Sequence, residues 1–328
     1  MGDIIMNNGG KYGRHFIQEV QEPRHFTPRD HEFYKMFAKR IMYIDSNIFP
    51  GAFQMNTVWY HSPLPPEGPG EHTHDFPELL GFYSADPNDP DDLGAEVEFT
   101  IEGEKHLITK STMIFIPAGV KHLPMALKNI RRPILHFGVC LNPEYAANYS
   151  DGSVTGLKDE AAVAKMLAEA ANDTGEVVMN DGGEYGKYII QKVHEPAHMT
   201  PERQEAYRKF ARRIMYMDTN VVPGAFQMNS SWYFGPTPDG PGHGEHTHDS
   251  PELIGFLSSD FNDRENLGAE VEFTIEGEKH LLTKSTMIFV PAGMRHLPMV
   301  VKNVKRPIFH FSICLEGEYV DKLTGREL

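Results

Sequence analysis

The sequence predicts an all-β fold, built as two tandem β-barrels with a few peripheral helices, and three observations support it. The chain contains an internal duplication, because the heptapeptide at 50–56 returns unchanged at 223–229. Residues 94–129 and 268–303 differ at six of 36 positions, so 30 are identical. Within each repeat, short alternating apolar and polar runs are separated by Gly, Pro, Asn and Asp, which is typical of barrels and sandwiches. A period this long indicates two whole domains rather than a solenoid.

Each repeat opens with a Gly-rich arm that leads into a helix candidate. Thr27-Pro28 and Thr200-Pro201 each supply an N-cap residue followed by Pro at the first helical position. Apolar residues after the first pair recur at helical spacing. They are Phe33, Met36, Phe37 and Ile41.

After Pro50 the apolar period changes to two, which indicates strands. The strand candidates of the first repeat are 53–60, 79–83, 97–101, 106–109, 113–116 and 134–141. Between the repeats, 157–171 is rich in Ala, Glu, Lys and Leu, which favours one more helix.

These elements suggest three segments. The first arm and barrel occupy 1–142, a linker with a helix occupies 143–175, and the second arm and barrel occupy 176–328. A chain of 328 residues suits two domains of ordinary size. The two repeats would form an intrachain pseudo-dimer, and further homo-oligomerisation remains open.

Composition excludes several classes of partner. Lys and Arg number 31 and Asp and Glu 46, so the net charge is 31 − 46 = −15, which disfavours nucleic acid and anionic membranes. No apolar run approaches the roughly 18–20 residues of a membrane span. The first residues lack the features of a secretory signal, so we expect a cytoplasmic protein. Cys140 and Cys314 lie at matching places in apolar runs, which favours buried thiols over a disulfide between the repeats.

One group of residues in the first repeat has the spacing of a metal site. His72 and His74 lie two positions apart, and on a strand such residues project from the same face. Glu78 keeps the even spacing, and His122 follows a Pro-Ala-Gly turn that can redirect the chain. The alternative is a set of surface or hydrogen-bonded histidines.

The second repeat carries the same pattern in full. Its members are His246, His248, Glu252 and His296. Two complete copies at matched separations favour a divalent transition metal in each repeat over incidental histidines. Three imidazoles and a carboxylate suit Fe, Mn, Co, Ni, Cu or Zn better than Ca or Mg, and we favour Fe or Mn.

The paired motifs, His-x-His-x3-Glu and Pro-x-Gly-x2-His, resemble the signature of the cupin superfamily. The resemblance covers about 45–142 and 218–316. It implies a double-stranded β-helix (jelly roll) in each half, hence a bicupin, with each quartet holding one metal. The separation between the motifs is longer than in many cupins, because an acidic loop is inserted at 84–94 and at 258–268.

Four further residues are candidate catalytic groups. His136 and His310 lie in the last strand of each barrel, where they could act as pocket acids or bases, or as hydrogen-bonded histidines between the repeats. Tyr60 and Tyr233 end the strand before the metal loop, where they could donate to a bound oxygen or pack on the rim.

Two polar pairs lie on the same strand as these tyrosines. They are Gln54 and Asn56 with their counterparts Gln227 and Asn229. If that strand face lines the pocket, these side chains contact the substrate or the metal ligands. Otherwise they are ordinary solvated residues.

Three functions fit these features. The favoured one is a dioxygenase-type oxidoreductase acting on a small metal-chelating enol, catechol or keto acid, because cupins of the quercetinase and pirin type resemble this pattern. The alternative is a redox-neutral decarboxylase, isomerase or lyase, since oxalate decarboxylase bicupins carry the same ligand set. The third is a non-enzymatic bicupin that binds a small ligand or metal.

Overall fold

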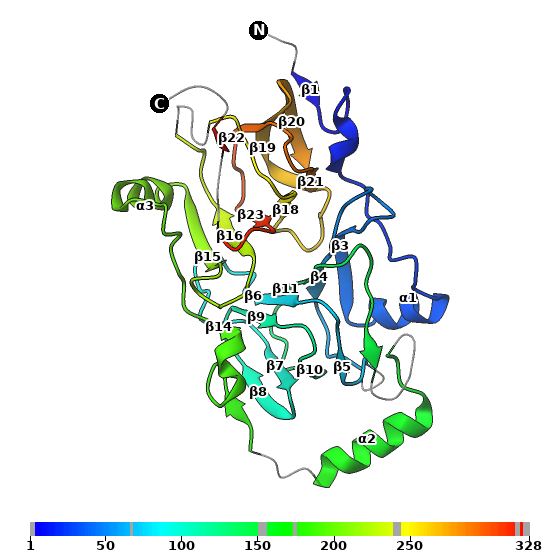
Figure 1. Ribbon diagram of the computed structural model, residues 1–328. Helices are drawn as coiled ribbons and strands as arrows, with labels where there is room; N and C mark the ends of the chain where they lie inside the picture. Colours follow the sequence, from blue (N-terminus) through cyan, green and yellow to red (C-terminus); the bar gives the residue numbers. More distant parts are fainter. Residues whose placement is uncertain are drawn as a thin grey trace. The chain divides into compact units, whose positions relative to one another are not determined.

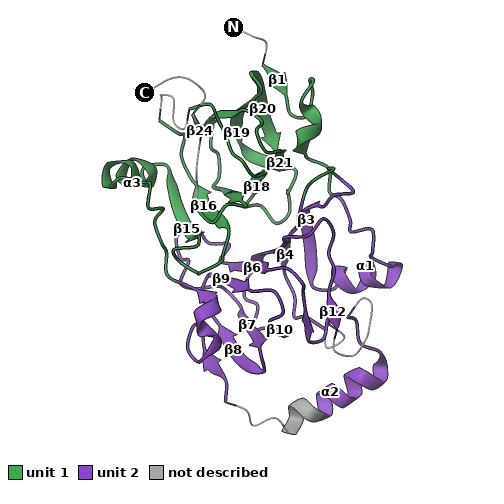
Figure 2. Cartoon of the chain, in the orientation of Figure 1, with its two compact units in different colours: residues 1–20, 49–52, 192–328 green, residues 21–48, 53–191 purple. Residues whose placement is uncertain are grey.

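The structure is a computed structural model, and it describes residues 4–65, 68–149, 156–172, 176–238, 244–318 and 322–323 (Figure 1). The chain divides into two compact units (Figure 2). Unit 1 comprises 1–20, 49–52 and 192–328, and unit 2 comprises 21–48 and 53–191. The described part of the chain is mainly β-strand with few helices, which confirms the predicted all-β class.

Unit 2 contains the first barrel, built from two six-stranded sheets. One sheet has the order β12-β5-β10-β7-β8-β13 and the other β14-β9-β6-β11-β4-β3. In that order the first sheet contains Asn148–Tyr149, His72–Thr73, His122–Lys128, Glu96–Ile101, Glu104–Ile108 and Val178–Met179. The second contains Ile189–Ile190, Thr112–Ile116, Glu78–Tyr83, Ile134–Cys140, Gln54–Tyr60 and Ala38–Ile44.

Unit 1 contains the second barrel, with the same arrangement of two six-stranded sheets. Their orders are β1-β20-β19-β22-β17-β24 and β15-β16-β23-β18-β21-β2. The first contains Ile5–Met6, Glu278–Lys284, Asn266–Ile275, His296–Lys302, His246–Thr247 and Lys322–Leu323. The second contains Ala211–Met217, Gln227–Tyr233, Ile308–Cys314, Glu252–Ser258, Thr286–Val290 and Phe16–Ile17.

Alternation along the strands builds the core of each barrel. In β7, Val97, Phe99 and Ile101 are fully buried, whereas Glu96 and Glu98 on the other face are partly exposed. Burying each apolar side chain contributes about 1.5–3 kcal/mol. The six predicted strands of the first repeat are present within a residue or two of their predicted ends.

The helices are short and begin at their predicted caps. Helix α1 (Pro28–Lys35) has Thr27 as its N-cap, and α3 (Pro201–Arg208) has Thr200. The expectation that helical spacing extends to Ile41 is wrong, because Ala38–Ile44 forms β3 and pairs with β4. The third helix, α2, spans Glu160–Asn172, and Asp159 accepts a hydrogen bond from its first turn.

The two arms pair with strands that lie far away in the sequence. Phe16–Ile17 (β2) pairs with β21 in unit 1, and Ile189–Ile190 (β14) pairs with β9 in unit 2. The predicted segments place each arm with the barrel that follows it in the sequence, whereas the strand pairing joins each arm to the barrel of the other repeat. Short 3-10 helices, η1 (Gly13–His15) and η2 (Tyr185–Tyr188), accompany these strands.

Contacts of one partly exposed carboxylate in each unit hold the arms in place. Glu278 accepts hydrogen bonds from the backbone nitrogens of Lys11 and Tyr12 at 3.2 and 3.0 Å. Glu104 does the same for Glu184 and Tyr185 in unit 2, at 3.0 and 2.9 Å. No helix within the described ranges is long and apolar enough to cross a membrane.

Candidate metal centres

The first quartet gathers where three strands of unit 2 meet. His72 begins β5 with His74 just beyond it, Glu78 begins β6, and His122 begins β10. His72 and His122 face each other across the antiparallel pairing of β5 and β10. The register of β10 shifts between His122 and Met125, and such a bulge re-aims a side chain at the rim of a barrel.

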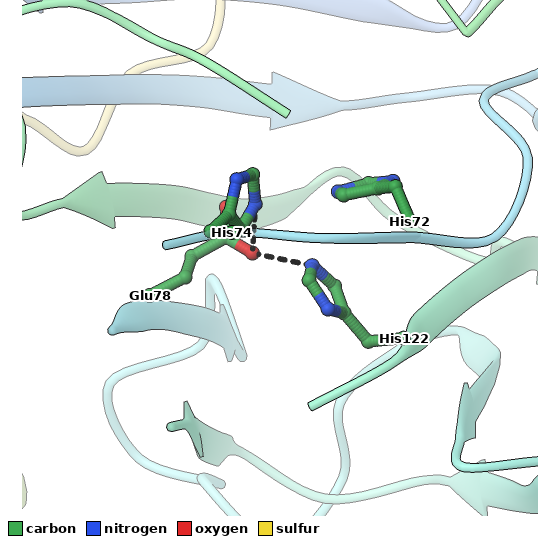
Figure 3. Close-up of side chains that lie close together, drawn as sticks. All are labelled: His72, His74, Glu78 and His122. Atoms are coloured by element: carbon green, nitrogen blue, oxygen red, sulfur yellow. Dashed lines mark ion pairs between the residues drawn. The ribbon is translucent and has the colours of Figure 1, made fainter. Parts of the chain in front are cut away.

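The four side chains of this quartet converge on one space (Figure 3). Nε2 of His122 lies 2.9 Å from Oε2 of Glu78, and Nε2 of His74 lies 3.5 Å from the same oxygen. One possible ligand atom from each of the four residues lies within 4.8 Å of the others. All four residues are buried, so bulk solvent has little access to these atoms.

Backbone carbonyls set the orientation of the three imidazoles. Nδ1 of His72 and Nδ1 of His122 each donate to the carbonyl two residues earlier, at 3.1 Å. Nδ1 of His74 donates to the carbonyl of Ala146 at 2.5 Å. Because a carbonyl oxygen only accepts, the ring hydrogen lies on Nδ1 and the lone pair of the neutral ring lies on Nε2. This is the orientation in which histidines bind metals through Nε2.

The second quartet repeats this geometry in unit 1. Nε2 of His296 lies 2.9 Å and Nε2 of His248 lies 3.5 Å from Oε2 of Glu252. Nε2 of His246 lies 3.1 Å from that of His248. Nδ1 of His246 and of His296 again donate to the carbonyls two residues earlier, at 2.9 and 3.0 Å.

Unsatisfied buried atoms support a cation in this space. Nε2 of His296 and Oε2 of Glu252 are 2.9 Å apart, yet neither has a hydrogen-bond partner among the described residues. Buried polar atoms are rarely left unsatisfied, and lone pairs that converge from three imidazoles and a carboxylate are satisfied by one metal ion. The two quartets are therefore metal-binding groups suited to a divalent transition metal.

Two members of the second quartet, His246 and Glu252, have the charges that metal binding requires. Burial and the neighbouring His296 lower the pKa of His246 to about 4, so its ring is neutral near pH 7. Burial raises the pKa of Glu252, but interactions with His248 and His296 outweigh it, and the net shift is downward. Neutral imidazoles and an ionised carboxylate are the forms that bind metals.

Part of the predicted linker lies against the first quartet. The hydroxyl of Tyr145 is 3.4 Å from Nε2 of His72, and that of Tyr149 is 3.5 Å from the Tyr145 hydroxyl. β12 adds to the sheet beside β5. Neither tyrosine is among the residues predicted from the sequence to form the site. The signal was available, because the pair Glu144-Tyr145 recurs as Glu318-Tyr319, so the repeat continues past residue 142.

The two cysteines are buried free thiols, as the sequence predicted. Sγ of Cys140 donates to Oε1 of Glu78 at 3.5 Å, so this thiol contacts the carboxylate of the first quartet. Burial raises the pKa of Cys140 well above its usual value, and the thiol therefore keeps its proton.

The four candidate catalytic residues pack in pairs. The ring of His136 stacks on Tyr60 with centroids 4.5 Å apart, and that of His310 lies 4.8 Å from Tyr233. Nδ1 of His136 and of His310 donate to backbone carbonyls on the neighbouring strand, at 2.8 and 3.0 Å. Burial lowers the pKa of both histidines to about 4.

A cavity of about 490 Å³ in unit 1 reaches the second quartet. Glu252 lines it together with His310 and Tyr233, so the structure brings a metal-site residue and two candidate catalytic residues to one space. Gln227 and Asn229 line it as well, which is the arrangement that would let them contact a substrate. Apolar and aromatic side chains form much of the remaining wall.

Comparisons with known proteins found similarity only among solved structures. No protein-family model and no curated protein matches the sequence. A point variant of oxalate decarboxylase from Bacillus subtilis is 12% identical, with a TM-score of 0.48, over 88% of this chain and 79% of that one. The same enzyme at pH 4.6 is 13% identical, with a TM-score of 0.45, over 87% of this chain and 73% of that one.

Proposed function

We propose that this bicupin, with a complete metal-binding quartet in each cupin domain, is a metal-dependent enzyme that moves a proton on a small chelating organic substrate without net oxidation. The reaction would be a decarboxylation, isomerisation or lyase-type elimination. This places the redox-neutral alternative ahead of the dioxygenase that the sequence analysis favoured.

One observation carries this proposal: two groups able to handle a proton share a cavity with the second quartet. His310 and Tyr233 line the same cavity as Glu252. Moving a proton to or from a bound substrate requires such groups within reach of it. A divalent metal at the quartet would supply Lewis acidity, which polarises a carbonyl or carboxylate of the substrate.

The protonation states of the two groups suit opposite tasks. The Nδ1 hydrogen of His310 is held by the carbonyl of Gly255, so the lone pair of the neutral ring lies on Nε2. Because burial lowers the pKa of His310 to about 4, the ring is a free base near pH 7 and can accept a proton. Burial raises the pKa of Tyr233 well above its usual value, so its hydroxyl remains protonated and can donate a hydrogen bond.

The dioxygenase remains a second candidate, and the cavity wall is what favours it. Phe210, Ile254 and Met299 line the same cavity as Glu252. An apolar wall accommodates dioxygen and the ring of a catechol or enol as readily as it does an aliphatic acid. A non-enzymatic binding protein would show ligand binding with no turnover of either kind.

The test compares one reaction panel with and without oxygen. Protein purified without added metal is analysed for bound metal, then loaded separately with Mn²⁺ and Fe²⁺ and incubated with keto acids, hydroxy acids and catechols. We expect about two metal ions per chain, and carbon dioxide release or isomerisation under anaerobic conditions. Turnover that stops without oxygen and consumes it in step with product would instead establish the dioxygenase.

A matched pair of variants assigns the chemistry to a residue. His310→Asn retains a donor for Gly255 but removes the base, and we expect about 10²–10⁴-fold lower kcat with unchanged metal content. His136→Asn makes the same change in the other barrel. Equal kcat for wild type and His310→Asn would refute the assigned role of His310.

A further inference from the structure

We infer that the unit 1 cavity takes a substrate with two polar ends: a chelating group at the second quartet and a carboxylate at Arg213. The inference rests on the proposed function, because it assumes that the quartet binds a metal and the metal binds the substrate. It adds the chemical class of that substrate. Arg213 and Glu252 line the same cavity, so one molecule can reach both.

Arg213 is held in one orientation before any ligand arrives. It lies on β15, and its side chain is 4% exposed. Nε of the guanidinium contacts Oε2 of Glu195 at 3.0 Å, and Nη1 donates to Oδ1 of Asn229. The guanidinium carbon lies 5.0 Å from the ring centre of Tyr207. A guanidinium fixed in this way loses little side-chain entropy when a ligand binds.

The remaining arm of the guanidinium has a weak acceptor. Nη2 donates to the thioether sulfur of Met199 at 3.2 Å. A thioether is a poor hydrogen-bond acceptor, whereas a carboxylate forms a charge-assisted bond with guanidinium that is roughly twice as strong as a neutral one. A ligand carboxylate that displaces the flexible Met199 side chain therefore gains a better bond than the one it breaks.

Charge around the cavity also favours an anion. Glu195 is shared between Arg213 and Arg208, whose Nη2 lies 3.1 Å from Oε1, so two cations share one carboxylate. Arg203 on α3 also lines the cavity. The charged residues that line the cavity are thus two arginines and one carboxylate, Glu252, so the lining has a positive excess on a chain whose net charge is −15.

The first repeat retains only part of this arrangement, which makes it a useful control. Arg40 contacts Glu22 at 2.9 Å and donates to Asn56, as Arg213 does with its own partners. The residue of the first repeat that corresponds to Arg203, however, is Asp30. Asp30 is buried and accepts hydrogen bonds from the N-cap Thr27. The additional positive charge at the cavity is thus specific to unit 1.

Cavity size and wall chemistry define the rest of the ligand. A volume of about 490 Å³ falls within the usual range of small-molecule sites and exceeds what a two-carbon acid fills. The wall of the same cavity also includes Phe210, Tyr233 and Met299. The expected substrate has an aromatic or branched apolar body between a chelating group and a carboxylate.

The experiment compares two chelators that differ mainly in the carboxylate. The probes are 3,4-dihydroxyphenylacetate and 4-methylcatechol, which both chelate through catechol oxygens. Binding is measured by calorimetry on full-length, zinc-loaded protein that carries His74→Ala, so that the first quartet no longer binds metal. Zinc has no redox chemistry, which keeps the catechols intact during the titration. We expect the carboxylate probe to bind about 10–100-fold more tightly, as charge-assisted hydrogen bonds imply.

Substitutions then test whether Arg213 causes the preference. The pair Arg213→Gln with Glu195→Gln removes both charges together, so that no unpaired buried charge destabilises the fold. It should abolish the preference and leave the affinity for 4-methylcatechol within about twofold. Arg203→Gln, at an exposed position, should reduce the preference only partly. The control pair, Arg40→Gln with Glu22→Gln, should leave the preference unchanged.

The outcomes separate this inference from the proposed function. Equal affinity of the wild-type cavity for the two probes would overturn the role of Arg213. A preference that persists in the Arg213→Gln, Glu195→Gln variant would overturn it as well. Either result leaves the proposed metal chemistry intact. If neither probe binds and zinc does not occupy the second quartet, the inference falls together with the proposed function.

Discussion

Burial of His310 predicts how the stability of unit 1 changes when the pH is lowered. The folded pKa of His310 is lowered to about 4 by burial, whereas an unfolded histidine titrates near 6.5. Between pH 6.5 and pH 4, His310 is therefore protonated in the unfolded chain but neutral in the folded protein. Stability that is fully present above pH 6.5 is therefore lost as the pH falls towards 4. A shift of this size corresponds to about 3 kcal/mol for this residue on going from pH 7 to pH 4.

The variant His310→Asn isolates this effect. Asn retains a donor for the carbonyl of Gly255 but does not titrate, so the loss of stability of unit 1 between pH 7 and 4 should be smaller by about 3 kcal/mol. Urea unfolding of metal-free protein measures it, with Trp232 fluorescence reporting on unit 1 once Trp59 is replaced by Phe. His246, with a folded pKa also near 4, supplies a remaining acid dependence in the same direction.

The matched change in unit 2, His136→Asn, should leave the Trp232 transition unaffected. If wild type and His310→Asn lose the same stability between pH 7 and 4, burial does not hold His310 neutral, and its assignment as a free base would be withdrawn. A smaller loss in His136→Asn than in wild type, observed through Trp232, would show that the two units do not unfold independently.

Three further predictions concern the metal quartets and the fold. His74→Ala and His248→Ala should each remove one metal per chain by elemental analysis while the circular dichroism spectrum is retained, and loss of both metals from one variant would show coupled sites. Gly255→Ala should destabilise unit 1 by about 1–3 kcal/mol or more in urea, because its Cβ would lie 2.0 Å from the ring of Phe311; an unchanged midpoint would contradict this close approach. Thr27→Ala removes the N-cap of α1 and should lower the stability of unit 2 by about 1 kcal/mol. A change smaller than about 0.2 kcal/mol would mean that the cap is dispensable.

Some strands were predictable and others were not, for identifiable reasons. β7 shows a period of two with apolar residues on one face, and it lies where the sequence placed it. β10 was missed because it contains Pro124 and a register shift, and a Pro within a run argues against a strand. The spacing of Phe37 and Ile41 predicts that the helix continues, whereas these residues lie at or within β3, which is buried through its pairing with β4.

The quartets were predictable because their chemistry is local. His72 and His74 share a strand face by spacing alone, and the repeat supplied a second copy as a check. The contact of Tyr145 with His72 could not be inferred by spacing, because 73 residues separate the two positions and only the pairing of β12 with β5 brings them together.

The sequence by itself determined the all-β class, the duplication and the eight residues of the two quartets, because periodicity and residue type act over a few positions. Only the tertiary structure decided which barrel each arm joins and which side chains share the cavity with Glu252. Arg213 illustrates the difference. In the sequence it is one basic residue on a strand, and its meaning comes from Glu195, Asn229 and the second quartet. Those partners are brought to it by strand pairing between distant segments, which no local pattern encodes.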